Sequence, residues 1–222
     1  LLESKPKVAD IPKNNHPNRL ITTFHGDTRS QMGFNWYTTD KFKDAKVWIS
    51  ESEDMSNAIS FSAEATEVTN QYAERTEEGY YIYADVEKDD EGNLVEDENG
   101  DPIINGYYTD EGKEGPEWMS GADVGYLELI DVKEYSYKAV ASDLKPNTSY
   151  YYQVGSESGE KSEVGKFSTS GEAGDAFTFV HYTDTQNAYW NENVRNEAAF
   201  GADTIKHAIE VAGNPDFVVH TG

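Results

Sequence analysis

Two short apolar segments near the end of the sequence constrain the fold more than any other feature. Residues 177–183 and 217–220 have the length and composition of strands. Polar residues follow each of them, starting with Asp184 after the first segment and ending with Gly222 after the second. Each segment is therefore expected to be a strand that ends in a polar turn.

The segment between these strands is predicted to be one helix. Small and apolar residues recur every three or four positions from Val194 to Ala212. Asn193 can cap the start, and Gly213 with Pro215 ends the pattern. A strand, a crossover helix and a second strand form a βαβ unit with parallel strands, whose ligand-binding groups gather at the carboxyl ends of the strands. Such a unit brings the polar turns after the two strands together.

The first 170 residues carry the pattern of a β-sandwich. Met32, Phe34 and Trp36 alternate with other residues and share one face of a strand, so Trp36 is predicted to lie in a core. Turn residues separate further strand-like segments at 45–49, 58–69, 135–141, 149–154 and 163–168. Many short strands at this spacing favour a sandwich of the immunoglobulin or fibronectin type III kind.

A Leu-x-Pro turn leads into a tyrosine-rich strand within this region. The turn is Leu144-Lys145-Pro146, and Tyr150 and Tyr152 follow it. In immunoglobulin-like sandwiches a tyrosine near the start of such a strand bonds back across the corner. We therefore expect at least one of these two tyrosines to be buried.

Composition limits the classes of partner. The formal net charge of −24 repels nucleic acid and anionic lipid surfaces, and a small phosphorylated substrate would need a metal ion to bind. The 222 residues contain no cysteine, which excludes disulfides and thiolate metal ligands. No run of 18 apolar residues is present, so no transmembrane helix is predicted.

An acidic insert is predicted at about residues 85–117. It holds 13 acidic and 2 basic residues and so contributes −11 to the net charge. Its turn sequences indicate one or two hairpins. Asp97-x-Asn99-Gly100-Asp101 matches part of a calcium loop, but the spacing of a complete loop with its distal Glu is absent. The expectation is a solvated, mobile loop without a tight calcium site.

Several segments together resemble purple acid phosphatases. Residues 33–38, 137–140, 144–150 and 164–169 are similar to the N-terminal domain of that family, in which a sandwich precedes the metallophosphatase domain. The resemblance implies three parts: a flexible N-terminal segment over 1–18, a fibronectin III-like domain over 19–170, and the first βαβ unit of a catalytic domain over 176–222. The fold class is thus mostly β, with an incomplete α/β part at the end.

The polar turns resemble the first two motifs of calcineurin-like metallophosphoesterases, an Asp-x-His followed by a Gly-Asp. Here Asp184-Thr185-Gln186 and Gly222 occupy these places, with Gln186 where many relatives have His. The resemblance implies that Asp184 and Gln186 are metal ligands. It also implies two metal ions of the Fe, Mn or Zn type in the complete protein, because hard oxygen ligands suit them.

The remaining motifs of that family would follow Gly222, so the fragment is expected to be inactive by itself and to need the rest of its catalytic domain. His181 and His220 lie inside the strands and are predicted to be packed strand histidines. The resemblance implies a hydrolase acting on phosphorylated small molecules. The polar N-terminal stretch favours an exported protein, at the cell surface or outside the cell. The alternative is a non-catalytic extracellular binding module of the fibronectin type III kind.

Overall fold

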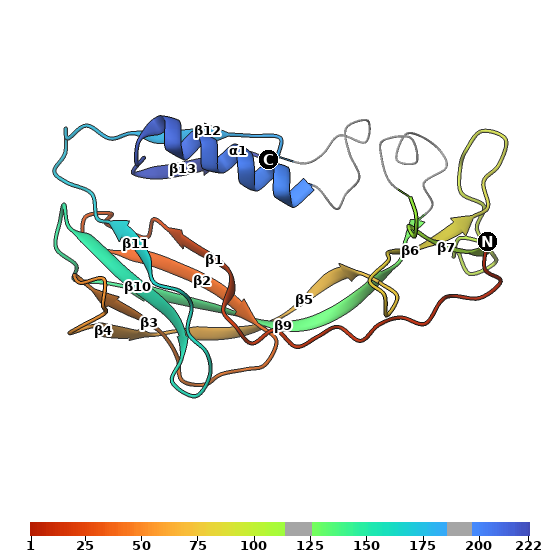
Figure 1. The fold of residues 1–222 in the computed structure, drawn as a ribbon, viewed down its shortest axis with the longest axis horizontal. Coiled ribbons are helices and arrows are strands. Elements are labelled where there is room, and N and C mark those ends of the chain that lie inside the picture. The colour runs from red at the N-terminus through yellow and green to blue at the C-terminus, as the bar shows by residue number, and fades with distance from the viewer. Residues whose placement is uncertain (114–125, 186–196) are drawn as a thin grey trace. The chain divides into compact units, whose positions relative to one another are not determined.

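The computed structural model describes residues 1–113, 126–185 and 197–222 (Figure 1). These residues form two compact units. The first unit comprises Leu1–Asp10, Gln71–Ile130 and Phe177–Gly222, and the second comprises Ile11–Asn70 and Asp131–Ala176. We describe each unit separately and call the second one the sandwich unit.

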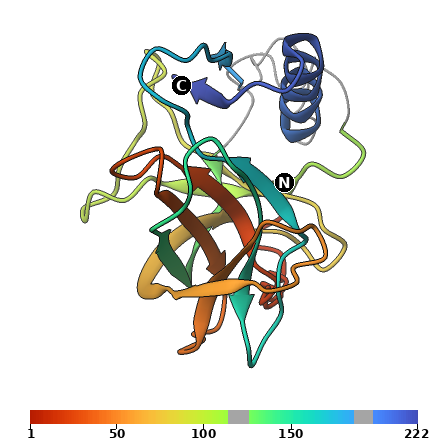
Figure 2. The same ribbon diagram turned by 90° about the vertical axis from the view of Figure 1, so that its left-hand side faces the viewer.

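The sandwich unit is built on two four-stranded sheets (Figure 2). One sheet has the order β1-β2-β9-β5, formed by β1 (Asn18–Thr23), β2 (Met32–Thr38), β9 (Leu129–Ala141) and β5 (Glu64–Ala73). The other has the order β11-β10-β3-β4, formed by β11 (Gly165–Ser168), β10 (Ser149–Ser156), β3 (Ala45–Ser50) and β4 (Ile59–Ser62). The predicted mostly-β fold is therefore confirmed.

The core of the sandwich unit lies on the face of β2 that the alternation predicted. Trp36 is only 1% exposed, and its ring stacks on Tyr137 of β9 at a centroid distance of 5.4 Å. Phe34 of the same strand meets Phe167 of β11 edge to face at 5.7 Å. Side chains of both sheets thus fill one core, and the prediction for Trp36 is confirmed.

The predicted tyrosine corner is present. The backbone N–H of Lys145 donates to the hydroxyl oxygen of Tyr150 over 2.9 Å, and Tyr150 is buried. Tyr152 is half-buried, and this burial raises the pKa of its hydroxyl. The bond links the turn before β10 to the start of that strand.

The single strand predicted at 58–69 is two strands in the structure. β4 pairs with β3 in one sheet, whereas β5 lies beside β9 in the other. Ala63, between them, donates its N–H to the carbonyl of Ala45. The chain therefore changes sheets here, because both sheets offer a free edge, and local periodicity cannot show such a change. β1 was not predicted either.

The other unit contains the acidic insert, which is wider than residues 85–117. β6 (Ile82–Val86) lies between β7 (Ile104–Thr109) and β8 (Tyr126–Leu127), and residues 71–130 belong to this unit. Ile82, Tyr83 and Ala84 are buried. The insert thus has a small core of its own.

The N-terminal segment, predicted to be a flexible tether, pairs with this unit. Leu2 and Tyr107 exchange two backbone hydrogen bonds, of 2.7 and 2.9 Å. The Lys5 ammonium lies 2.5 Å from a Glu74 oxygen and 2.6 Å from a Glu128 oxygen. Burial lowers the pKa of Lys5, but the bonds to Glu128 and Glu74 raise it more, so the net shift is upward. The division between the two compact units falls after Asp10, and the domain boundary expected at residue 18 stays a prediction.

The insert contains two tight turns, at residues 89–93 and 97–101. In one turn the Asp97 carboxylate accepts hydrogen bonds from the N–H groups of Asn99 and Asp101, at 2.8 and 3.1 Å. In the other turn the Asp89 carboxylate accepts hydrogen bonds from the N–H groups of Glu91 and Asn93. The backbone bonds from Asp101 and Asn99 hold the pKa of Asp97 below its ordinary value. The two hairpin turns indicated by the sequence are present. The expected lack of a tight calcium site stays a prediction.

The predicted strand–helix–strand order is present at the end of the chain. β12 (Phe179–Tyr182) and β13 (Phe217–His220) are parallel, with Phe179 opposite Phe217, and α1 (Glu197–Ala212) lies between them in sequence. Among the described residues, no helix is long and apolar enough to cross a membrane.

Candidate functional site

The candidate site lies at the carboxyl ends of β12 and β13. The Asp184 N–H donates to the carbonyl oxygen of Gly222, so the turns after the two strands are joined as the βαβ rule predicts. The Thr183 hydroxyl lies 2.8 Å from the same carbonyl oxygen and 3.0 Å from Asp184 Oδ2. A hydroxyl has one proton, so Thr183 donates to one of these acceptors at a time.

The backbone of Asp184 adopts an uncommon conformation. Its φ is 53°, in the left-handed region that few residues other than Gly enter, although Asp tolerates it better than most. The side chain is exposed. Backbone strain of this kind is often found at functional sites. Here it turns the chain sharply after β12 and leaves the Asp184 carboxylate facing solvent.

The two strand histidines form reciprocal contacts with threonines. His181 on β12 lies 3.1 Å from the hydroxyl of Thr221, which follows β13. His220 on β13 lies 3.2 Å from the hydroxyl of Thr185, which follows β12. The two turns are therefore linked by side chains as well as by the backbone. The sequence reasoning missed both threonines, although their position just after each strand was a usable signal.

The prediction that His181 and His220 are packed strand histidines is wrong for the described structure, in which both side chains are exposed. The physical reason is the small size of this sheet. Within the described residues it has two strands, and Phe177 and Phe179 are also exposed, at 64% and 51%. A two-stranded sheet has too few neighbours to bury both of its faces.

The described residues near Asp184 include a suitable metal ligand, but they provide too few ligands to hold a metal ion. A carboxylate is a suitable ligand for Fe, Mn or Zn. The second predicted ligand, Gln186, lies outside the described residues, as do Asn193 and Val194 of the predicted helix start. Within the ranges described, no three His, Cys, Asp or Glu side chains gather in a way that could hold a metal ion. The described residues therefore contribute one carboxylate and not a complete metal site.

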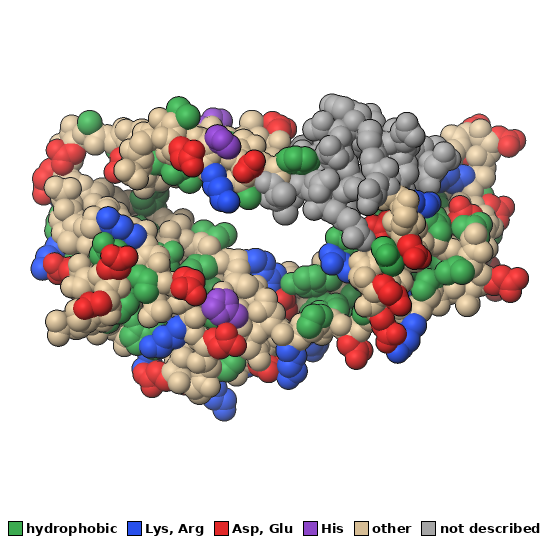
Figure 3. Space-filling view, viewed as in Figure 1, with side chains coloured by type: hydrophobic (Ala, Val, Ile, Leu, Met, Phe, Trp, Pro, Cys, Tyr) green, Lys and Arg blue, Asp and Glu red, His purple; other side chains and the backbone are tan. Residues whose placement is uncertain are grey.

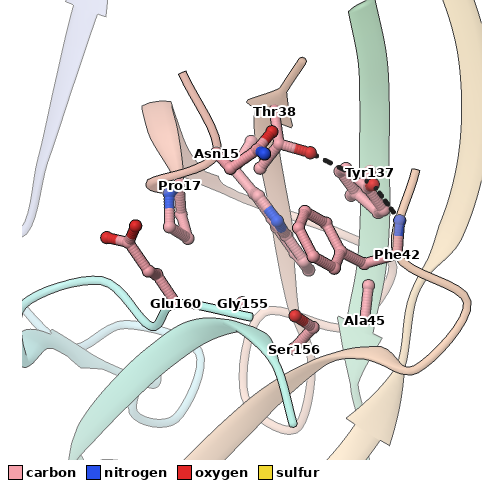
Figure 4. Close-up of a pocket in the computed structure, with 10 residues that line it drawn as sticks. Asn15, Pro17, Thr38, Phe42, Ala45, Tyr137, Gly155, Ser156 and Glu160 are labelled. Atoms are coloured by element: carbon pink, nitrogen blue, oxygen red, sulfur yellow. Dashed lines mark hydrogen bonds between the residues drawn. The ribbon is translucent and has the colours of Figure 1, made fainter. Parts of the chain in front are cut away.

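A narrow cleft in the sandwich unit, lined by residues that include Trp36, Phe42 and Tyr137, is too tight to hold a water molecule (Figure 4). At its edge the Tyr137 hydroxyl accepts the N–H of Phe42 at 2.8 Å, lies 3.1 Å from Thr38 Oγ1 and donates to the Asp40 carbonyl. These polar groups already pair with one another. The cleft is therefore part of the packing at this end of the sandwich, and its polar groups are not poised for a ligand.

The surface charge of the sandwich unit is mixed on the face drawn in Figure 3, where basic side chains lie among acidic ones. Many basic groups pair with carboxylates: Lys145 with Glu51 at 2.6 Å, and Lys133 with Glu67 at 3.0 Å. Such pairs neutralise one another locally and contribute little to stability.

The architecture described above is a two-sheet sandwich with a tyrosine corner, followed in sequence by a parallel strand–helix–strand unit. The family profile described as "Purple acid Phosphatase, N-terminal domain" matches residues 17–169, more than half of the chain. The chain therefore belongs to the family of purple acid phosphatase N-terminal domains, which confirms the resemblance found in the sequence. The parent family is one of phosphatases.

A solved structure of purple acid phosphatase PPD1 from yellow lupin (Lupinus luteus) seeds is similar to this chain, with 14% sequence identity and a TM-score of 0.43. The match covers 94% of this chain and 36% of the lupin chain, so this chain spans about a third of that phosphatase. No curated protein matches the sequence.

Proposed function

We propose that the chain is the N-terminal part of a metal-dependent phosphoesterase. The observation that carries the proposal is the order of its parts. A sandwich of the purple acid phosphatase N-terminal family is followed by a parallel strand–helix–strand unit in which Asp184 and Gly222 lie at neighbouring strand ends. In this proposal residues 1–18 lead into the sandwich of 19–170, and 176–222 begin the catalytic domain.

In the proposed site Asp184, with Gln186 beside it in sequence, provides ligands to one of two metal ions of the Fe, Mn or Zn type. Bound metals would clamp the phosphate ester and supply a hydroxide near neutral pH. The chain's own contribution is positional. Thr183 and the Gly222 carbonyl hold the turn, in which Asp184 has a left-handed backbone and an exposed side chain.

The proposed substrates are small phosphorylated molecules, and the proposed partner is the remainder of the catalytic domain. The net charge of −24 opposes approach of a phosphate ester unless cations neutralise it, which agrees with metal dependence. The proposed location is outside the cell or at its surface. A non-catalytic extracellular binding module is the second candidate, favoured by the sandwich fold alone.

The test compares Asp184→Asn with wild type in the complete encoded protein, using a chromogenic phosphate monoester and diester with added Mn, Fe or Zn. Removing an outer-sphere partner of a metal ligand typically costs 10- to 100-fold, so loss of a direct ligand should lower turnover by more than about 100-fold. Asp203→Asn makes the same substitution on the exposed side of α1 and should leave turnover unchanged.

Two results would contradict the proposal. One is full activity of the Asp184→Asn protein. The other is metal-dependent turnover by the 222-residue chain alone, since the proposal gives this chain ligands for one metal only. Absence of any metal-dependent activity in the complete protein would favour the binding module.

A further inference from the structure

The outer face of the sheet β11-β10-β3-β4 has an unusual composition. Side chains alternate along each strand, so those opposite the buried Val47, Ile49 and Val154 point away from the core. We call this surface the lysine–aromatic face; its strand residues with side chains are Lys46, Trp48, Ser50, Ser60, Ser62, Ser149, Tyr151, Gln153, Lys166 and Ser168. None of them is Asp or Glu, although 42 of the 222 residues are acidic.

Two lysines, one on this face and one in the loop beside it, lie over aromatic rings. Lys161, in the loop after β10, places its ammonium 4.0 Å from the centroid of the Trp48 ring. The ammonium of Lys166 lies 5.7 Å from the centroid of Tyr151. Within the described part of the chain, neither lysine forms an ion pair, whereas Lys46 pairs with Glu157 at 2.6 Å. Two ammonium groups therefore keep their charge available in a strongly acidic protein.

The strand register sets the spacing of the two rings. Trp48 of β3 lies opposite Gln153 of β10 and Ser60 of β4, and Tyr151 lies opposite Lys166 of β11. Because Tyr151 is two residues from Gln153, the rings of Trp48 and Tyr151 are diagonal neighbours, about 7 to 8 Å apart at their backbones. The two half-exposed rings thus form a short row, with a hydroxyl or amide group beside each.

We propose that the lysine–aromatic face binds an acidic polysaccharide in which charged and neutral sugars alternate. Lys161 and Lys166, which lie over the two rings in the free protein, would swing aside, and the sugar rings would then lie on Trp48 and Tyr151. Rigid aromatic side chains offer a large contact area at a small cost in side-chain entropy. The carboxylates of the polysaccharide would pair with Lys161 and Lys166. The Gln153 amide already donates to the Ser162 carbonyl at 2.8 Å, and the hydroxyls of Ser149 and Ser168 pair at 3.0 Å. The Gln153 amide oxygen and the hydroxyls of Ser60 and Ser62 supply acceptors and donors suited to sugar hydroxyls.

Single-stranded nucleic acid is the main competing ligand, since it too binds aromatic rings flanked by basic residues. Its affinity depends on neutralising several phosphates. This face has two unpaired ammonium groups, and the chain as a whole carries −24. A polymer with fewer charges per unit length matches two ammonium groups better.

The test is an amide-shift NMR titration of the 222-residue chain with a hyaluronan octasaccharide at low salt. Shifts should be confined to β3, β4, β10, β11 and the loop of Lys161. The double variant Lys161→Gln/Lys166→Gln should raise Kd at least about tenfold, and Trp48→Ala should do the same. Lys138→Gln, an exposed lysine on β9 of the other sheet, is the charge-matched control and should leave Kd unchanged.

Four results would overturn the proposal. The first is no shift on this face, and the second is equal binding of neutral maltooctaose. The third is equal or tighter binding of an eight-nucleotide oligothymidylate. In the fourth, Lys138→Gln weakens binding as much as the double variant does, which would indicate diffuse electrostatics. Both lysines of the double variant are exposed and outside the core, so its fold, checked by circular dichroism, should be retained.

Discussion

Replacing Trp36 by Ala should remove a central part of the sandwich core. The side chain is 1% exposed and stacks on Tyr137 with an angle of 11° between the rings. Truncation of a buried Trp or Phe to Ala typically costs about 3 to 5 kcal/mol. The stacked pair adds about 0.5 to 1.5 kcal/mol beyond burial, so we expect a loss near the upper end of that range.

The assay is urea unfolding followed by far-ultraviolet circular dichroism, with Trp48→Ala as the matched control. Trp48 is half-exposed and points away from the core, so its loss should cost less than about 2 kcal/mol, cation–π contact included. A loss below about 1 kcal/mol for Trp36→Ala would refute the assigned core. Equal losses in the two variants would refute the inside–outside assignment of β2 and β3.

Two further predictions concern the corner and the insert. Tyr150→Phe leaves the Lys145 N–H without its partner and should destabilise the sandwich by about 1 to 3 kcal/mol in the same urea assay; a neutral effect would show that the bond is dispensable. Asp97 should titrate below its ordinary value of 3.8, because the N–H groups of Asp101 and Asn99 favour its charged form. Because the pKa of Asp97 is lower in the folded protein, the charged carboxylate stabilises the turn fully above about pH 3.8. This stabilisation is lost as the pH falls through the folded-state pKa. A titration midpoint at or above 3.8, measured by NMR of the Asp97 carboxyl group, would contradict the prediction.

Local sequence patterns predicted correctly the features that do not depend on which strands pair with one another. The alternation of Met32, Phe34 and Trp36 assigned the buried face of β2, because any sheet that packs on one side must bury that face. The Leu-x-Pro corner predicted a bond to a tyrosine near the start of the next strand, and in the observed bond, to Tyr150, donor and acceptor are only five residues apart. Neither prediction requires knowing which strand lies next to which.

The fold features that the sequence analysis missed depend on contacts between residues far apart in the sequence. Leu2 pairs with Tyr107 across more than a hundred residues, and Lys5 reaches Glu128, so the segment expected to be a loose tether is held in the unit of the insert. Residues 59–73 divide between two sheets for the same reason. A strand pattern states that a segment is extended, but the choice of neighbour depends on which edges the rest of the chain leaves free.

At the candidate site the sequence by itself determined that Asp184 and Gly222 meet, because a crossover helix makes the strands parallel and brings their ends to one edge. Only the tertiary structure decided the left-handed backbone of Asp184 and the exposure of His181 and His220. The same holds for the reciprocal bonds of the two histidines to Thr221 and Thr185. These features depend on the register between strands and on what covers the sheet, and neither is encoded in the periodicity of a single strand.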